Sequence, residues 1–377
     1  MTDRERIWKE FRTLTSFDSE SFHEKAITDY LERRLKELGL ITARDRADEL
    51  LGKASEDSTG NLYGYLPGVG EKSILFSSHT DTVVPGRGKK AILQADGTIT
   101  SDGSTVLGAD DAAGLTAILE ALTRIRERDL PHPPIEVLIP VAEEPYCKGT
   151  SVFDFSKLRS RISYTLDLTG PIGTAAYAAP SIIFFSVEVT GRAAHAGFAP
   201  EEGINALTIV TRALSRIQTG RLSPDTTLNF GTVHGGAASN IVPENIVLEG
   251  EIRSLIHEQA LKVLSEVEKE FEGAAKELGG SIRLHKEERI RSYETSLEGE
   301  AAKRFLRAVK KTGVHGGNAE FVKTFGGSDQ NRLSEAGVTG LVLACGMEQV
   351  HSTREYTSLT ALSESAGLVL ELMTDPS

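Results

Sequence analysis

Hydrophobic positions change their period several times along the first half of the chain. Short apolar runs at 72–77, 135–141 and 162–168 have the length and continuity of buried strands. Residues 21–38 and 111–127 instead repeat apolar side chains every three or four positions, which predicts helices with one buried face. Strands that alternate with helices are typical of an α/β domain with a mainly parallel sheet.

Two local signals add detail to this pattern. Ser21 and Glu24 have the spacing of a capping box, so we expect the first of these helices to begin there. The polar, glycine-rich stretch 85–105 predicts a hairpin or a loop.

The pattern changes near residue 180, where residues 182–189 alternate like a half-exposed strand. The elements that follow are a helix at 204–217, strands at 228–234 and 246–255, a helix at 257–278 and a strand at 281–290. This β-α-β-β-α-β order predicts a small ferredoxin-like α+β domain. After it the first pattern resumes, with helices at 298–311, 329–336 and 358–373 and strands at 321–326 and 339–345. We therefore expect one domain from residues 1–179 and 291–377, with a second domain, residues 180–290, inserted into it.

Composition limits the range of partners. The chain has 42 Lys and Arg against 54 Asp and Glu, a formal net charge of -12, which argues against binding to nucleic acid phosphates. Two cysteines cannot form a disulfide framework, no apolar stretch is long enough to span a membrane, and the charged start MTDRERIWKE lacks a signal-peptide core. These features predict a cytoplasmic protein with no membrane partner.

Acidic residues and histidines stand at or just after the ends of the apolar runs. In chain order they are His79, Asp81, Asp110, Asp111, Glu143, Glu144, Asp167 and His351. Parallel sheets bind ligands at the carboxyl ends of their strands, and buried carboxylates need a compensating partner. Two histidines and three carboxylates can form the inner shell of two divalent metal ions, and one further carboxylate can serve as general base. The cluster predicts a metal-dependent hydrolase.

Each member of this cluster also has an ordinary structural interpretation. Asp110 and Asp111 suit the N-cap of a helix, Glu143 and Glu144 suit a solvated acidic turn, and His351 suits a surface position. The metal site is favoured by the set as a whole and not by any single residue.

Seven segments carry a family resemblance, in order, through nearly the whole chain. They are SHTDTV (78–83), LGADDAAG (107–114), VAEE (141–144), LDLTG (166–170), GRAAHAG (191–197), GGAASNIVPE (235–244) and VHSTRE (350–355). These segments resemble the dinuclear zinc exopeptidases, the family that includes peptidase T, glutamate carboxypeptidase and the aminoacylases. SDGSTVLGADDAAG looks most like the peptidase T branch. Two positions depart from that branch, Ala112 where Lys is common and Ser328 where the glycine-rich loop usually has Thr.

The resemblance implies a role for each proposed metal ligand. His79 and Asp167 would hold one metal ion, and Glu144 and His351 would hold the other. Asp110 would bridge the two ions, with the peptide bond that follows it in the cis form.

The resemblance also implies the groups that act on the substrate. Asp81 would orient the histidine two residues before it, and Glu143 would be the general base. His195 of the inserted domain would stabilise the tetrahedral oxyanion, and the partner subunit of a dimer is one source of this histidine. The substrate-binding groups would be Asn240, Arg253, Gly327 and Ser328. A salt bridge on the strand surface is the other interpretation of Arg253.

The expected activity is a tripeptidase-like aminopeptidase that hydrolyses di- and tripeptides with two divalent metal ions. Zinc is the first expectation, and cobalt or manganese can share such ligands. N-acyl amino acid hydrolysis and carboxypeptidase activity use the same metal centre and remain open, as does a peptide-binding protein without activity. The inserted domain would act as a lid and form a homodimer.

Overall fold

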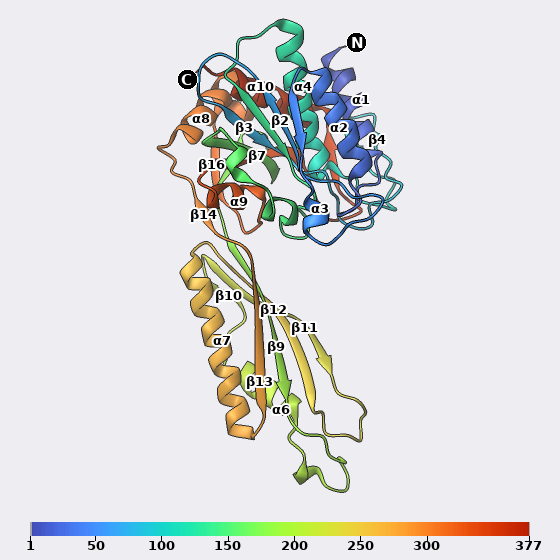
Figure 1. The fold of residues 1–377 in the computed structure, drawn as a ribbon, viewed down its shortest axis with the longest axis vertical. Helices are drawn as coiled ribbons and strands as arrows, with labels where there is room; N and C mark the ends of the chain where they lie inside the picture. Colours follow the sequence, from blue (N-terminus) through green and yellow to red (C-terminus); the bar gives the residue numbers. More distant parts are fainter. Residues whose placement is uncertain (1, 377) are drawn as a thin grey trace. The chain divides into compact units, whose positions relative to one another are not determined.

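The computed structural model describes residues 2–376 and divides into two compact units (Figure 1). Unit 2 comprises Ala179–Tyr293 and Phe325–Gly327, and unit 1 comprises the other described residues. Ala179 and residues 291–293 and 325–327 therefore fall in unit 2, although the sequence boundaries assign them to the first domain. The reason is clear at Gly327, whose backbone packs so closely on Ile290 that an added Cβ would lie 2.1 Å from the Ile290 Cδ1.

Unit 1 is built around a sheet that has nine strands within residues 2–376. The strands are β1 Ile41–Arg44, β2 Leu62–Leu66, β3 Ile74–Ser77, β6 Ile135–Ile139, β7 Ile162–Thr169, β8 Thr174–Ala179, β14 Tyr293–Glu294, β15 Glu320–Lys323 and β16 Thr339–Met347. Their order is β1-β2-β6-β3-β7-β16-β8-β14, with β15 beside β8. The central strands β6, β3, β7 and β16 are parallel, whereas β1, β2 and β6 pair antiparallel at one end and β16 and β8 at the other. The predicted α/β class with a mainly parallel sheet is confirmed.

Helices cover both faces of this sheet. The elements are α1 Asp3–Thr15, α2 Lys25–Glu37, α3 Ala47–Leu50, α4 Ala109–Arg128, α5 Lys148–Ser151, α8 Glu300–Thr312, α9 Asp329–Glu335 and α10 Leu359–Thr374, with the 3-10 turns η1 Phe155–Lys157 and η3 Val314–Gly317. Every residue of β3 and β6 is buried, as expected for strands covered on both sides. Phe76 joins the main core, to which α1, α4, α8 and α10 contribute, and Leu75 points to the other face and packs with Leu333 of α9.

The glycine-rich stretch 85–105 forms the predicted hairpin. Its strands are β4 Ile92–Leu93 and β5 Thr98–Thr100, and β5 also pairs with β17 Tyr356–Ser358. The hairpin is therefore tied to the segment that follows His351.

Unit 2 contains an antiparallel sheet in the order β10-β11-β12-β9-β13. Its elements are β9 Ser181–Thr190, η2 Pro200–Glu202, α6 Ala206–Leu214, β10 Gly220–Ser223, β11 Thr226–Gly235, β12 Asn245–Ser254, α7 His257–Leu278 and β13 Ser281–Ile290. Buried positions alternate along β12, and its buried side chains pack against α6 and α7. The predicted β-α-β-β-α-β order is confirmed. The edge strand β10 is additional, and the sequence pattern missed it because none of its residues is buried.

The predicted capping box at Ser21 and Glu24 is wrong. The helix begins at Lys25, and Glu24 at its N-cap makes no side-chain capping bond. The Ser21 hydroxyl instead donates to the Asp81 carboxylate at 2.7 Å, and the Glu24 carboxylate accepts the Ala142 N–H at 2.8 Å. Both side chains hold the loops at the carboxyl end of the sheet and not the end of their own helix.

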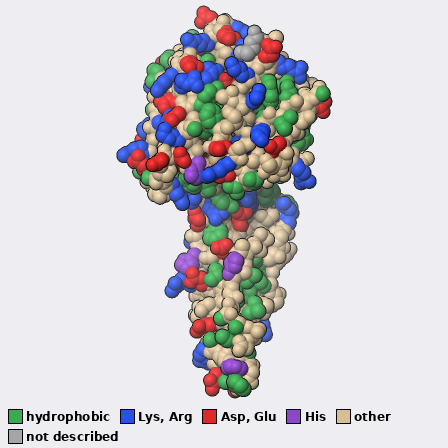
Figure 2. Space-filling model, turned by 90° about the vertical axis from the view of Figure 1, so that its right-hand side faces the viewer, with side chains coloured by type: hydrophobic (Ala, Val, Ile, Leu, Met, Phe, Trp, Pro, Cys, Tyr) green, Lys and Arg blue, Asp and Glu red, His purple; other side chains and the backbone are tan. Residues whose placement is uncertain are grey.

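The surface mixes charges of both signs. On the face shown in Figure 2, Lys and Arg side chains are interspersed with Asp and Glu over unit 1. Within residues 2–376, no helix combines the length and the apolar character that a bilayer span requires.

Candidate metal centre

The predicted metal ligands lie at the carboxyl ends of neighbouring parallel strands. His79 follows β3, Glu144 follows β6, and Asp167 lies near the end of β7. Asp110 is the second residue of α4, and His351 lies between β16 and β17. Because β6, β3 and β7 are adjacent and parallel, their ends meet at one edge of the sheet, which is where such folds place ligands.

Asp110 lies between the two histidines. Its Oδ1 is 3.1 Å from His79 Nε2, and its Oδ2 is 3.2 Å from His351 Nε2. Glu144 Oε2 is 3.0 Å from the same His351 nitrogen. The two oxygens of one carboxylate therefore face two different imidazoles, as a bridge between two cations requires.

Two sets of potential ligand atoms come together at this place. His79, Asp110 and Glu144 offer atoms that all lie within 4.8 Å of one another, and so do His79, Glu143 and Asp167. His79 belongs to both sets, so the sets are contiguous. They hold nitrogen and oxygen donors of the kind that zinc and related divalent ions bind.

The electrostatics of the cluster fit bound cations. Burial raises the pKa of Glu143 and of Asp167 well above the usual range of a carboxyl group, and it also raises the pKa of Glu144. The Glu144 Oε1 is buried and has no hydrogen-bond partner within residues 2–376. So many carboxylates in one buried place are unfavourable unless positive charge compensates them, and two divalent ions would do so.

The pKa values of the two histidines are also raised, in this case by neighbouring carboxylates and against the effect of burial. Burial alone would lower the pKa of His79, but the Asp110 and Asp81 carboxylates raise it well above its usual value. Hydrogen bonds with Asp110 and Glu144 raise the pKa of His351, 53% of whose side chain is exposed, to about 10. The surrounding carboxylates therefore favour positive charge at these imidazoles, as they would favour a bound cation.

Asp81 is fully buried and supports both sides of the cluster. Its Oδ1 lies 3.3 Å from His79 Nδ1, within ion-pair distance but outside hydrogen-bond geometry. The backbone N–H groups of Glu143 and Glu144 donate to its two oxygens at 2.8 and 3.1 Å. One carboxylate thus lies against the ring of His79 and holds the turn that carries Glu143 and Glu144.

The two neighbouring aspartates have different roles at the start of α4. Asp111 accepts the Gly114 N–H at 3.1 Å and the Ser78 hydroxyl at 2.5 Å, so it caps the helix. Asp110 lies in a non-helical conformation before it, and the peptide bond between them is cis. The N-cap interpretation is therefore right for Asp111 only, and the Asp110 carboxylate is left to face the histidines.

Glu355 holds the loop that presents Asp110, and the sequence analysis assigned it no role. This carboxylate is buried and accepts the N–H groups of Gly108 and Asp110, each at 2.8 Å. Burial raises the pKa of Glu355 to about 7. Because Glu355 lies four residues after His351, it ties the His351 loop to the Asp110 loop. The only sequence signal was its place at the end of the VHSTRE segment.

We expect Glu355→Gln to weaken metal binding by about 10–100-fold, the usual effect of losing a group behind a metal ligand. Glutamine offers one acceptor oxygen where the two N–H groups need two, and its NH₂ would face a backbone donor. Competition with a chromogenic chelator measures the affinity. Glu298→Gln, at an exposed carboxylate elsewhere in unit 1, is the matched control. Equal affinities in the two variants would show that Glu355 does not position Asp110.

Glu143 lies in a tightly folded turn beside the ligands. It is buried, and the Cys147 thiol donates to its Oε1 at 3.3 Å. Ala142, Tyr146 and Cys147 in this turn have positive φ angles of 49°, 70° and 54°, conformations that non-glycine residues rarely adopt. Such conformations are held by surrounding contacts and are common at functional sites.

The predicted lid residues lie in unit 2. His195 is exposed, and its Nδ1 accepts the N–H groups of Gly197 and Phe198 at 3.1 and 3.2 Å. Since Nδ1 is an acceptor, the ring proton belongs on Nε2, which makes Nε2 a hydrogen-bond donor. The Asn240 carbonyl accepts the Ala196 N–H at 3.0 Å, so Asn240 is adjacent to the His195 segment.

The other predicted substrate-binding residues have structural partners. The Arg253 guanidinium donates to Glu251 at 2.6 Å and to the Phe325 carbonyl at 2.7 Å, which agrees with the salt-bridge interpretation. Ser328 caps α9, since its hydroxyl accepts the Gln330 N–H at 3.3 Å. Gly327 precedes Ser328, and its close packing on Ile290 leaves no room for a Cβ atom.

Sequence comparisons match this chain to peptidases. The family model described as "Peptidase dimerisation domain" matches residues 177–278, and that of "Peptidase family M28" matches residues 61–210. The uncharacterized protein YqjE of Bacillus subtilis is 33% identical over 376 residues, which cover 100% of this chain and 99% of the relative. Peptidase T of Clostridium novyi is 22% identical over 364 residues, which cover 95% of this chain and 86% of the relative.

Solved structures agree with the sequence comparisons. The aminopeptidase PepT from Bacillus cereus has a TM-score of 0.91 at 34% identity, and a tripeptidase from Staphylococcus aureus has a TM-score of 0.94 at 32% identity. Each comparison covers 98% of both chains. A dinuclear metal binding peptidase of the M20 family from Bacillus subtilis shares the fold, with a TM-score of 0.72 at 16% identity. This chain therefore belongs to the M20/M28 family of dinuclear metallopeptidases, and its structural neighbours include peptidase T-like enzymes.

Proposed function

We propose that the protein is an aminopeptidase that removes the N-terminal residue from short peptides, chiefly di- and tripeptides. The observation that carries this proposal is the Asp110 carboxylate between His79 and His351, with Glu143 beside them as a further carboxylate. The choice of an aminopeptidase among the activities of the family is supported by the aminopeptidase and the tripeptidase that are 34% and 32% identical to it.

Each proposed ligand is assigned to one of the two metal ions or to both. His79 and Asp167 would hold one ion, Glu144 and His351 the other, and Asp110 both. Two divalent ions would polarise the scissile carbonyl and lower the pKa of the attacking water. Zinc is the proposed metal, with cobalt and manganese as alternatives that the same ligands accept.

Glu143 is the proposed general base. It accepts a proton from the attacking water and passes it to the nitrogen of the leaving group as the peptide bond breaks. Burial raises the pKa of Glu143, so the carboxyl group can hold this proton between the two transfers. Asp81 keeps the Glu143 backbone in place through the 2.8 Å hydrogen bond to its N–H.

His195 is the proposed oxyanion group. Its Nε2 proton, fixed by the two N–H groups at Nδ1, is the donor that a developing negative oxygen needs. The matched dimerisation domain supports a homodimer, in which the partner subunit is one source of this histidine. Asn240, Arg253, Gly327 and Ser328 are the proposed substrate-binding residues. The two cysteines are free and buried, which agrees with a cytoplasmic location.

A peptide panel with metal removal and return tests the proposal. We expect chelated protein to be inactive, and zinc, manganese or cobalt to restore cleavage of dipeptides and tripeptides that have a free amine. The panel includes tetrapeptides and N-acetylated forms, and product analysis shows which end was cut. Cleavage of acylated amino acids alone would make the protein a deacylase, and release of C-terminal residues would make it a carboxypeptidase. If no substrate is cleaved with any of the metals, the proposed enzymatic activity is refuted.

A further inference from the structure

A buried threonine of α5 supports the turn that carries Glu143. The Thr150 hydroxyl lies 2.5 Å from Asp329 Oδ1 and 3.2 Å from the Cys147 carbonyl oxygen, so its single proton is shared between these two acceptors. Thr150 is fully buried, and Asp329 is only 2% exposed. Neither residue is a proposed metal ligand or substrate contact, so the bond between them needs an explanation of its own.

Cys147 connects this threonine with Glu143. The Cys147 N–H donates to the Glu143 carbonyl at 2.6 Å, and the Cys147 thiol donates to Glu143 Oε1 at 3.3 Å. Because Thr150 bonds to the carbonyl of the same cysteine, a shift of Thr150 would move the thiol that contacts the Glu143 carboxylate. Three contacts in sequence therefore lead from Asp329 to the side chain of Glu143.

The backbone of this turn has other supports. Asp81 accepts the Glu143 N–H at 2.8 Å, and Asn61 Nδ2 donates to the Gly149 carbonyl at 2.8 Å. Cys147 has a positive φ of 54°, a conformation that a non-glycine residue keeps only where surrounding contacts hold it. These bonds fix the path of the chain, whereas the thiol contact acts on the Glu143 carboxylate itself.

The charges of Asp329 and Glu143 influence each other. Burial is the main cause of the raised pKa of Glu143, and the negative charge of Asp329 raises this pKa further. Burial also raises the pKa of Asp329, to about 6, against the effect of the hydrogen bond from Thr150. Because like charges repel, a fixed position for both carboxylates requires a group that holds Asp329. The Thr150 hydroxyl is suited to this task.

We propose that Thr150 and Asp329 are positioning residues for Glu143. Asp329 holds the Thr150 hydroxyl, and Thr150 holds the Cys147 carbonyl. The Cys147 thiol then keeps the Glu143 carboxylate in the orientation that proton transfer needs. This inference rests on the proposed role of Glu143 as general base. It depends on no particular substrate, so it applies equally to peptide cleavage and to deacylation at the same centre.

Thr150→Val tests the proposal, because valine keeps the shape of the side chain and lacks the hydroxyl. We expect kcat to fall by about 10–100-fold while KM and the number of bound metal ions stay unchanged, since a small misplacement of a catalytic group has effects of this size. Thr150→Ser retains the hydroxyl and should restore most of the kcat. Asp329→Ala should lower kcat by a similar factor. Any substrate that the unmodified enzyme cleaves serves for these measurements.

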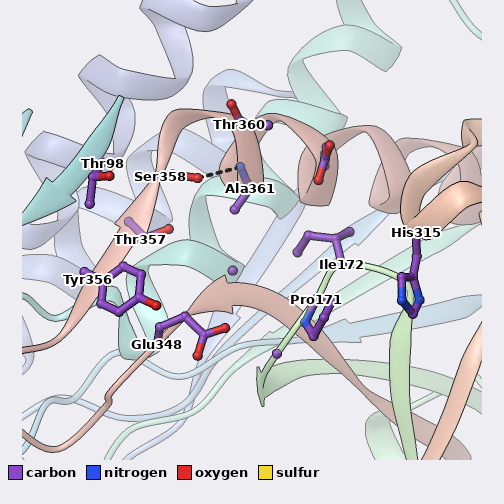
Figure 3. Close-up of a pocket in the computed structure, with 13 residues that line it drawn as sticks. Thr98, Pro171, Ile172, His315, Glu348, Tyr356, Thr357, Ser358, Thr360 and Ala361 are labelled. Carbon is purple, nitrogen blue, oxygen red and sulfur yellow. Dashed lines mark hydrogen bonds between the residues drawn. The ribbon is translucent and has the colours of Figure 1, made fainter. Parts of the chain in front are cut away.

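A structural role alone would lower stability and leave kcat unchanged. Ser358→Ala is the control for this case, because Ser358 caps α10 by accepting the Ala361 N–H at 3.1 Å, in another loop of unit 1 (Figure 3). Loss of this cap should lower the unfolding temperature only. The proposal is overturned if Thr150→Val behaves in the same way. It is also overturned if Thr150→Val loses metal, since Thr150 would then support the ligands and not the base.

Infrared spectroscopy supplies a second measurement that needs no activity. The S–H stretching band of a thiol reports its hydrogen bond, and Cys147→Ala identifies which band belongs to Cys147. Glu143→Ala gives the position of this band without the acceptor. We expect Thr150→Val to shift the Cys147 band toward that position, and an unchanged band would reject the path through Cys147.

Glu143→Gln separates a failure of this inference from a failure of the proposed function. Full activity in Glu143→Gln would reject Glu143 as the base, and the positioning role would be rejected with it. An inactive Glu143→Gln beside a fully active Thr150→Val would overturn the positioning role alone.

Discussion

Replacing Asp110 with alanine is expected to leave about one bound divalent ion or none per chain and to lower turnover by about 10³-fold or more. The reason is that Asp110 faces both histidines, at 3.1 Å and 3.2 Å, so its loss removes one ligand from each proposed ion. Metal analysis after gel filtration gives the stoichiometry, and peptide hydrolysis at saturating zinc gives the turnover. Two tightly bound ions in the alanine variant would refute the bridge.

Asp111→Asn is the matched control for that experiment. Asp111 is the adjacent carboxylate and is equally buried, but it accepts hydrogen bonds from Ser78 and Gly114 and contacts neither histidine. An asparagine oxygen can still accept the Gly114 N–H, and its NH₂ can donate to the Ser78 hydroxyl. We therefore expect two bound ions in this variant. Loss of metal there as well would mean that the helix start, and not the Asp110 carboxylate, determines occupancy.

Much of the site could be predicted because its ligands follow strands that the apolar pattern reveals. The runs at 72–77, 135–141 and 162–168 became β3, β6 and β7, which lie side by side and parallel. Once the strands are parallel neighbours, the residues after them meet at one edge. The apolar pattern therefore predicts that His79, Glu144 and Asp167 lie at this edge, whereas their individual roles as ligands come from the family resemblance.

The supporting residues could not be predicted in this way. Glu355 bonds to the backbone of Gly108 and Asp110, which lie about 250 positions earlier in the chain, as the separations of 247 and 245 residues show. Glu24 and Ser21 looked like a local capping box, yet both bond to loops that come much later in the sequence. A pattern read along the chain records which face is buried and does not record distant polar partners. These partners depend on tertiary packing.

Asp110 and Asp111 also show that a sequence pattern does not record polar partners, even for two adjacent residues. Both residues suit an N-cap by composition, and only the backbone conformation decides which one caps. The non-helical angles at both residues turn Asp111 toward Gly114 and leave Asp110 facing the histidines. The N-cap interpretation is therefore confirmed for Asp111, whereas the bridging role of Asp110 stays a prediction that its position between the two histidines supports.

Replacing Glu143 with glutamine is expected to lower kcat by about 10²–10⁴-fold while both metal ions stay bound, because proton transfer is lost and no proposed ligand is removed. The neighbouring variant Glu144→Gln should instead lose bound metal, and activity should fall as a consequence. The reason is that Glu144 lies 3.0 Å from His351 and is a proposed ligand. The two glutamates are adjacent and both carry a raised pKa, so this pair separates a proton carrier from a ligand under nearly identical conditions.

The comparison also tests where Glu143 belongs, because one of the two candidate ligand sets contains it together with His79 and Asp167. If Glu143 were a ligand, its glutamine variant would lose metal, and excess zinc would restore activity. If it is the base, excess zinc would restore nothing, since the ions are already in place and the missing step is the transfer of a proton. Turnover measured against zinc concentration therefore separates the two roles, and rescue of Glu143→Gln by zinc would move Glu143 from the base to the ligands.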